Sequence, residues 1–259
     1  MPPPHVNLGP LARTVLDRAP WRNTNEFPSN QVWADEFERV LAFLHSQGVF
    51  EDRFLSRLSA NEWEGALTEA RAAFFFHRNG FEITDWHPEA VNDRPGDLEV
   101  RWRGSEPVFV EVKRPGWEGE LSADELRARR QQQPKYIQGD ARAVDPIARI
   151  AYAVDKALPK FSADRCNLVV TVDDLFMSPT EIVTDWVVGR LEEQLREEKY
   201  SVVAGVFMLS PVKYADVDSV EYRKWFVVNA TARRPLPDEI REGLIRGNLD
   251  PQGPHWSRR

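Results

Sequence analysis

The sequence predicts an α/β fold, and two features of the chain carry that prediction. Segments whose apolar residues recur at helical spacing are interleaved with short segments rich in Val, Ile and Phe. The run Asn167–Val172 (NLVVTV) is almost wholly apolar and follows a helical segment, which is typical of a central strand covered on both faces. A chain of 259 residues, 42% of them hydrophobic, is long enough for one large α/β domain or for a domain with an extension.

The first part of the chain predicts an extension in front of the main domain. Residues 1–30 are interrupted by Pro and Asn, and we expect an extended arm or a segment packed loosely on the surface. Residues 31–47 show helical spacing and end at Gly48, and a shorter helix is expected over residues 51–58. We therefore assign residues 1–60 to an N-terminal arm and helical extension that forms a lid or packing layer.

The segment 61–78 predicts a helix that carries a carboxylate on its apolar face. With about 100° between successive residues, Glu69 falls among small and aromatic side chains such as Ala66, Ala73 and Phe76. The polar face is expected to hold Glu64, Thr68, Arg71 and Arg78. A carboxylate that faces a core must be paired, protonated or bound to metal. Glu69 is thus a candidate metal ligand, or the ion-pair partner of a core Arg or Lys, or a snorkelled surface residue.

A predicted β-hairpin over residues 97–113 places charged side chains where a strand pattern should be apolar. In its second strand, Val108–Lys113, Glu111 and Lys113 share one face because strand side chains alternate. A three-residue loop around Gly104 would put Asp97 opposite Glu111 and on the same face. A two-residue turn at Gly104-Ser105 would put Asp97 on the other face. A shared carboxylate site requires the longer loop or a bulge, and the sequence leaves both registers open.

The hairpin residues also resemble a known signature. Pro95-Gly96-Asp97, followed fourteen residues after the Asp by Glu111-Val112-Lys113, is similar to the motif of the PD-(D/E)xK nuclease superfamily, with Gly96 inserted between the Pro and the Asp. The resemblance implies a restriction-endonuclease-like αβββαβ core over residues 61–172, with a central mixed sheet flanked by helices. Strands and a helix beyond it would complete a nuclease-like domain at residues 61–246.

The resemblance implies a role for each residue of the motif. Asp97 and Glu111 would bind Mg²⁺ or Mn²⁺ beside the scissile phosphate, with the Val112 carbonyl as a further ligand. Lys113 would stabilise the attacking water or the developing charge, and Glu69 would complete the site from the preceding helix. The alternatives are a turn Asp after Pro-Gly at Asp97 and a strand lysine that protects a sheet edge at Lys113. Glu62, on the same helix face as Glu69, is its substitute.

The second half of the chain supplies further helices and strands. A helix is expected over residues 147–158, with Asp145 as its cap, and Arg149, Tyr152 and Lys156 share one side of it. The resemblance implies a phosphate contact for Lys156, and Arg149 is the second candidate for binding nucleic acid. Other expected elements are helices over 120–133 and 180–198 and strands over 201–209 and 221–229. Residues 247–259 are expected to form a flexible tail.

Charge and cysteine content limit the classes of function. The net charge of −7 counts against a nucleic-acid partner unless bound metal supplies positive charge. The single cysteine, Cys166, excludes an internal disulfide framework and fits a reducing compartment. No signal-peptide pattern or membrane-length apolar run occurs, so we expect a cytoplasmic protein without a membrane partner. No P-loop, dinucleotide-binding or zinc-hydrolase motif occurs in the chain.

Together these observations predict a Mg²⁺-dependent (endo)nuclease that hydrolyses phosphodiester bonds of nucleic acid, with DNA preferred over RNA as the substrate. The alternative is a catalytically inactive protein of the same fold that acts as a binding or assembly subunit. The sequence leaves the oligomeric state open, a homodimer included.

Overall fold

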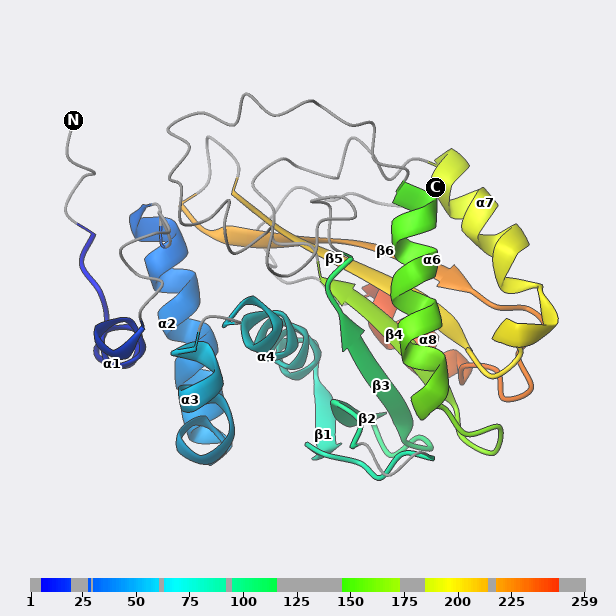
Figure 1. Ribbon diagram of the computed structural model, residues 1–259, viewed down its shortest axis with the longest axis horizontal. Helices are drawn as coiled ribbons and strands as arrows, with labels where there is room; N and C mark the ends of the chain where they lie inside the picture. The colour runs from blue at the N-terminus through cyan, green and yellow to red at the C-terminus, as the bar shows by residue number, and fades with distance from the viewer. Residues whose placement is uncertain are drawn as a thin grey trace.

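The computed structural model describes residues 6–19, 28, 30–60, 63–91, 95–115, 146–172, 185–213 and 218–246. Over these residues the chain is an α/β protein built on a six-stranded mixed sheet (Figure 1). The strands lie in the sheet in chain order: β1 Phe81–Asp85, β2 Leu98–Trp102, β3 Val108–Lys113, β4 Asn167–Val172, β5 Gly205–Lys213 and β6 Val220–Val228. The pairs β1–β2, β2–β3 and β5–β6 are antiparallel, whereas β3–β4 and β4–β5 are parallel.

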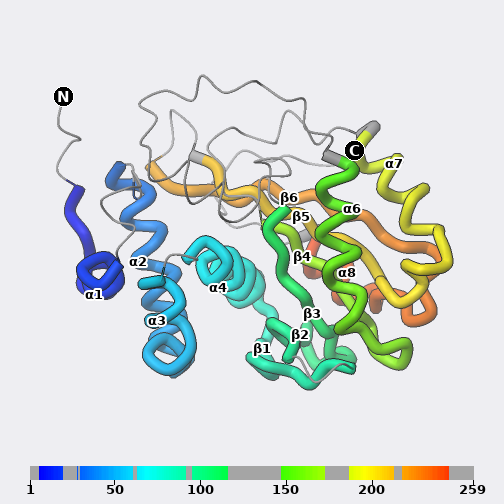
Figure 2. The backbone as a smooth tube through the Cα atoms, viewed as in Figure 1, coloured from blue at the N-terminus to red at the C-terminus, as the bar shows by residue number. Residues whose placement is uncertain are grey.

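Helices cover both faces of the sheet. The main helices are α1 Pro10–Arg18, α2 Gln31–Ser46, α3 Leu55–Leu58, α4 Trp63–Arg78, α6 Pro146–Ala157, α7 Asp185–Leu195 and α8 Asp238–Arg246. A π-helical turn, η2 (Phe50–Phe54), precedes α3, and a 3₁₀ turn, η3 (Leu158–Lys160), follows α6. Figure 2 shows α1, α2 and α3 on the side of α4 that faces away from the sheet. No described helix is both long and apolar enough to cross a membrane.

The alternation of β3 side chains assigns its residues to two separate cores. Val108, Val110 and Val112 belong to the core cluster that contains α4, whereas Phe109 belongs to the cluster that contains α6 and α7. Because side chains alternate along a strand, Glu111 points to the same side as Phe109. The candidate carboxylate of β3 therefore lies on the α6 side of the sheet.

The expectation of an extended arm over residues 1–30 is wrong at α1. Pro10 stands in the first turn of this helix, where its missing N–H costs nothing, and Ala12 is buried against the rest of the protein. The Glu38 carboxylate, from α2, accepts hydrogen bonds from the Leu11 N–H at 3.2 Å and the Ala12 N–H at 2.7 Å. A helix N-terminus is stabilised by such an anion. The cap is distant in the sequence, so no local capping pattern marks this helix.

The face of α4 that was predicted to be polar is only partly exposed to solvent. Thr68 and Arg71 are buried, because α2 covers the side of α4 that the sheet leaves open. Arg71 donates two hydrogen bonds to the Glu36 carboxylate of α2, at 3.0 and 2.9 Å. The Tyr222 hydroxyl of β6 donates to the same carboxylate. The extension is thus joined to the sheet domain by a buried charged cluster as well as by apolar packing.

Two other expectations are revised near the end of the chain. The predicted strand 201–209 begins at Gly205 and runs to Lys213, antiparallel to β6. Helix α8 was not expected, and its Ile240 and Leu244 are buried in the core near β2. The expected helix over 120–133, the cap at Asp145, the substitute Glu62 and the tail 247–259 lie outside the described residues.

Candidate functional site

The register of the β2–β3 hairpin places the two candidate metal ligands level with each other. Leu98 pairs with Val110 in an antiparallel ladder. The next residues outward are Asp97 and Glu111, so the observed register is the one that a shared carboxylate site requires.

The turn reaches this register through an irregularity. Arg103 and Gly104 both have positive φ values, 45° and 81°, and the Ser105 N–H donates to the Trp102 carbonyl at 2.8 Å. This is a two-residue turn, and by itself it would set a ladder one residue out of step with the observed one. The extra residue is absorbed before β3 begins, where Pro107 lacks the N–H that a ladder would use. The hairpin therefore brings Asp97 opposite Glu111 through a bulge and not through a three-residue loop.

Asp97 lies where β3 extends past the beginning of β2. Its Oδ2 atom accepts a hydrogen bond from the Val112 N–H at 2.8 Å, in place of a strand partner. The residue before Asp97 is a glycine, and a Cβ atom at Gly96 would overlap the Phe109 ring. The Gly96 N–H donates to the Pro88 carbonyl at 2.8 Å. The extra Gly of the motif, Gly96, is thus required by the close packing against Phe109.

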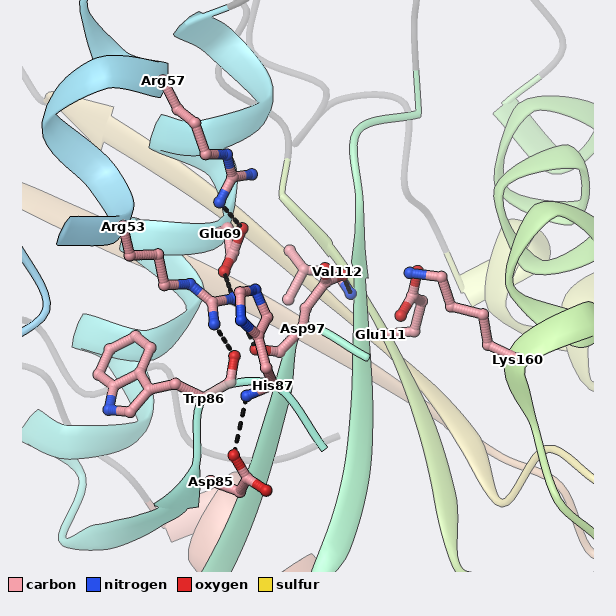
Figure 3. Close-up of polar contacts among 10 residues, drawn as sticks. All are labelled: Arg53, Arg57, Glu69, Asp85, Trp86, His87, Asp97, Glu111, Val112 and Lys160. Atoms are coloured by element: carbon pink, nitrogen blue, oxygen red, sulfur yellow. Dashed lines mark hydrogen bonds and ion pairs between the residues drawn. The ribbon is translucent and has the colours of Figure 1, made fainter. Parts of the chain in front are cut away.

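Glu111 is completely buried, and its two carboxylate oxygens have different surroundings. Oε1 accepts from the Lys113 ammonium and from the Lys160 ammonium, the latter at 2.6 Å. Oε2 has no hydrogen-bond partner among the described residues. Burial and the neighbouring charge of Asp97 raise the pKa of Glu111, and Lys113 acts against that shift. Figure 3 shows the Lys160 side chain reaching Glu111 from the far side of β3 relative to Glu69.

Glu69 is held by two arginines from the N-terminal extension. One oxygen pairs with Arg53, and the other pairs with Arg57 Nη1 at 2.7 Å. Burial and the charge of Asp97 raise the pKa of Glu69, while Arg53 and Arg57 lower it. In Figure 3, Glu69 and Glu111 lie on opposite sides of β3. The structure thus shows the ion-pair alternative for Glu69, so we do not count it among the proposed ligands.

The carboxylates therefore do not form one three-membered cluster. Within the described ranges, no group of three or more His, Cys, Asp or Glu side chains is placed to hold a metal ion. Asp97 lies level with Glu111 in the hairpin, and its charge raises the pKa of both Glu69 and Glu111. The pair that shares one end of the hairpin is Asp97 and Glu111.

Arg53 connects the extension to the loop that carries Asp97. Its guanidinium donates to the Asp97 carbonyl at 3.1 Å and to the Trp86 carbonyl, and its side chain is only 9% exposed (Figure 3). The next residue, His87, lies in the same area, and burial together with the charges of Arg53 and Arg57 lowers the pKa of His87. The sequence pattern did not single out these residues, because their partners are distant in the chain.

Several cationic side chains lie at the site, although the chain as a whole is acidic. Its cationic side chains, drawn from three separate segments, are Arg53, Arg57, Lys113, Arg114 and Lys160. Lys160, one helical turn beyond the predicted Lys156, is the residue of this region that reaches a carboxylate. Arg149 and Lys156 lie on α6 and do not contact Asp97 or Glu111. A role for them in nucleic-acid binding stays a prediction.

In comparisons with known proteins, no family model, curated protein or solved structure matched this chain.

Proposed function

We propose that this protein is a metal-dependent nuclease of the PD-(D/E)xK type, with a restriction-endonuclease-like core, that hydrolyses phosphodiester bonds in DNA. The observation that carries the proposal is the arrangement at the end of the hairpin. Asp97 and Glu111 lie level with each other, and a lysine two residues after Glu111 contacts its carboxylate. This combination supplies metal ligands and a cation at one point of the sheet.

The donor set fits a hard divalent cation. Glu111 Oε2 is buried and has no hydrogen-bond donor among the described residues. Such a state is costly for a carboxylate oxygen, and a bound cation would relieve it. Carboxylate and carbonyl oxygens are the ligands that Mg²⁺ and Mn²⁺ prefer. The residues that would hold the ion are Asp97, Glu111 and the carbonyl of Val112. The ion, when bound, lowers the pKa of a water molecule and offsets charge on phosphate oxygens.

The side chains around these ligands prepare the site for an anionic substrate. The Val112 N–H fixes one oxygen of Asp97, which orients that carboxylate before any substrate arrives. Lys113 and Lys160 bring two ammonium groups to the same oxygen of Glu111. These ammonium groups are placed to stabilise negative charge that develops on a phosphate, with little reorganisation of the protein. Arg53 holds the main chain at Asp97 and is a positioning residue.

Cleavage of plasmid or oligonucleotide DNA tests the proposal. We expect cleavage that requires Mg²⁺ or Mn²⁺, that falls to background in Asp97→Asn and Glu111→Gln, and that falls roughly 100- to 1000-fold in Lys113→Met. Glu106→Gln is the matched control, because Glu106 is an exposed carboxylate in the loop of the same hairpin, at the end away from Asp97 and Glu111. A wild-type protein that shows no metal-dependent cleavage of duplex or single-stranded nucleic acid contradicts the proposal.

The second candidate is an inactive protein of the same fold that serves as a binding or assembly subunit. It is favoured by the two lysines that already pair with Glu111 and by the ion pairs that occupy both oxygens of Glu69. Calorimetry with Mn²⁺ separates the two. Mn²⁺ binding to the wild type that is lost in Asp97→Ala and Glu111→Ala supports a nuclease. Absence of Mn²⁺ binding to the wild type supports an inactive binding or assembly subunit.

A further inference from the structure

Helix α6 carries a row of side chains that ends at the proposed active site. Arg149, Tyr152 and Lys156 are three and four residues apart and therefore share one face of the helix. Lys160 of η3 continues the spacing and contacts Glu111 at 2.6 Å. We name these four residues the α6 stripe. A helix rises about 1.5 Å per residue, so Tyr152 lies roughly 12 Å along the axis from Lys160.

Tyr152 is an unusual surface residue. Its exposed fraction is 54%, and among the described residues only Val91 is another large hydrophobic side chain that is exposed. The Lys156 ammonium lies over the Tyr152 ring, 5.2 Å from its centroid. An ammonium group can cover only one face of a ring, so the other face of the Tyr152 ring can stack against a second planar group. An exposed aromatic ring beside a cation is the combination that binds a nucleotide base and its phosphate.

The charge of the stripe is positive and is not neutralised by its own helix. Asp155 is the one carboxylate in α6 and η3, and it pairs with Lys199 at 3.3 Å. No described residue forms an ion pair with Arg149 or Lys156. The two cations are thus available to phosphate groups, in contrast to the acidic balance of the whole chain.

We infer that the α6 stripe binds an unpaired DNA strand and guides it to Asp97 and Glu111, with one base stacked on Tyr152 and phosphates on Arg149 and Lys156. In a duplex each base is already stacked between its neighbours, so a protein ring stacks readily only on a base of an unpaired strand. The inference rests on the proposed function and names its substrate class, which is single-stranded DNA or a duplex with a single-stranded end.

Fluorescence anisotropy without metal tests the inference, with a labelled oligothymidylate and a duplex of the same length as probes. Tyr152→Ala is expected to weaken oligothymidylate binding roughly 5- to 150-fold, the loss typical of one stacked base, and to leave duplex binding within about twofold. Tyr152→Trp should retain oligothymidylate binding. Lys156→Ala should weaken both probes and reduce the dependence of binding on salt. Because Tyr152 is exposed, Tyr152→Ala should unfold at the same urea concentration as the wild type.

Arg103→Ala is the matched control. Arg103 is also an exposed cation over an aromatic ring, 4.9 Å from the centroid of Trp102, but it lies in the β2–β3 turn and not in the α6 stripe. We expect this variant to bind both probes as the wild type does. Equal losses for both probes in Tyr152→Ala, no loss in that variant, or no oligothymidylate binding by the wild type would each overturn the inference. Metal-dependent cleavage that persists in those cases leaves the proposed function standing. Tyr152-dependent binding without any cleavage leaves the stripe standing and removes the nuclease.

Discussion

The buried carboxylates of this protein differ in how completely they are satisfied. Glu36 accepts two hydrogen bonds from Arg71 and one from Tyr222, and all three side chains are buried. Burial and the charge of Glu36 raise the pKa of Tyr222 well above its ordinary value, so the hydroxyl stays protonated and donates. Glu111 instead has one buried oxygen for which the described part of the chain supplies no donor. Glu36 thus joins three elements through a fully paired carboxylate, whereas the carboxylate of Glu111 is only partly paired within the described residues.

Arg71→Met is expected to lower the free energy of unfolding by about 3–5 kcal/mol, because it leaves Glu36 buried without its counter-charge. Arg190→Met is the control, since Arg190 pairs with Glu193 on the surface of α7 and the pair is worth less than about 1 kcal/mol. Urea unfolding of both variants measures the difference. A loss below about 1 kcal/mol in Arg71→Met would show that the cluster does not hold the extension to the sheet.

Glycines in two elements have opposite roles. Gly205 begins β5, and a Cβ atom there would lie 2.7 Å from the Val227 carbonyl oxygen of β6. The glycine therefore lets the two main chains approach each other. Gly65 lies in α4, where a Cβ atom would meet nothing within 4 Å. At that position the glycine only weakens the helix.

Replacement of each glycine by alanine should change stability in opposite directions. Gly205→Ala should lower the free energy of unfolding by about 1–3 kcal/mol, because backbone atoms must move apart. Gly65→Ala should raise it by about 0.5–1 kcal/mol through helix propensity. Denaturant titrations of the two variants measure both effects. A neutral Gly205→Ala variant would mean that the β5–β6 pairing can widen without loss.

At the scale of the whole molecule, one hydrophobic core joins the extension to the sheet domain. Buried residues from α1, α2, α4, β2 and α8 belong to the same cluster, which includes Cys166. Cys166 is the single cysteine of the chain and its Sγ lies 3.6 Å from the Pro235 carbonyl oxygen, before α8. Burial raises the pKa of Cys166 to about 12 from 9.0, so its thiol reports on opening of this core.

Iodoacetamide labelling at pH 8 should leave Cys166 unmodified in the folded protein and modify it at the rate of a free thiol in denaturant, because only the thiolate reacts. A raised folded pKa also gives a stability contribution that is fully present below pH 9.0 and is lost as the pH rises towards about 12. The wild type should therefore lose stability relative to Cys166→Ala as the pH is raised above 9.0. Labelling of the native protein at the free-thiol rate would show that this core opens readily.

Local sequence was sufficient for features that depend on residue type and spacing. The strands Val108–Lys113 and Asn167–Val172 were predicted at their observed bounds, because apolar runs and turn residues mark strands directly. The helix that ends before Gly80 was predicted for the same reason, since this residue has φ 81° and stops it. The α/β class follows from the alternation of such segments.

Tertiary structure alone decided which distant residues meet. A bulge before β3, rather than the turn, set Asp97 level with Glu111. Arg53 and Lys160 contact the site residues from elements whose local sequence does not indicate such contacts. Glu38 of α2 caps α1, in a segment where the sequence predicts an extended arm. Periodicity encodes which side of an element is buried, but the partner of a buried charge depends on chain segments brought together only by folding.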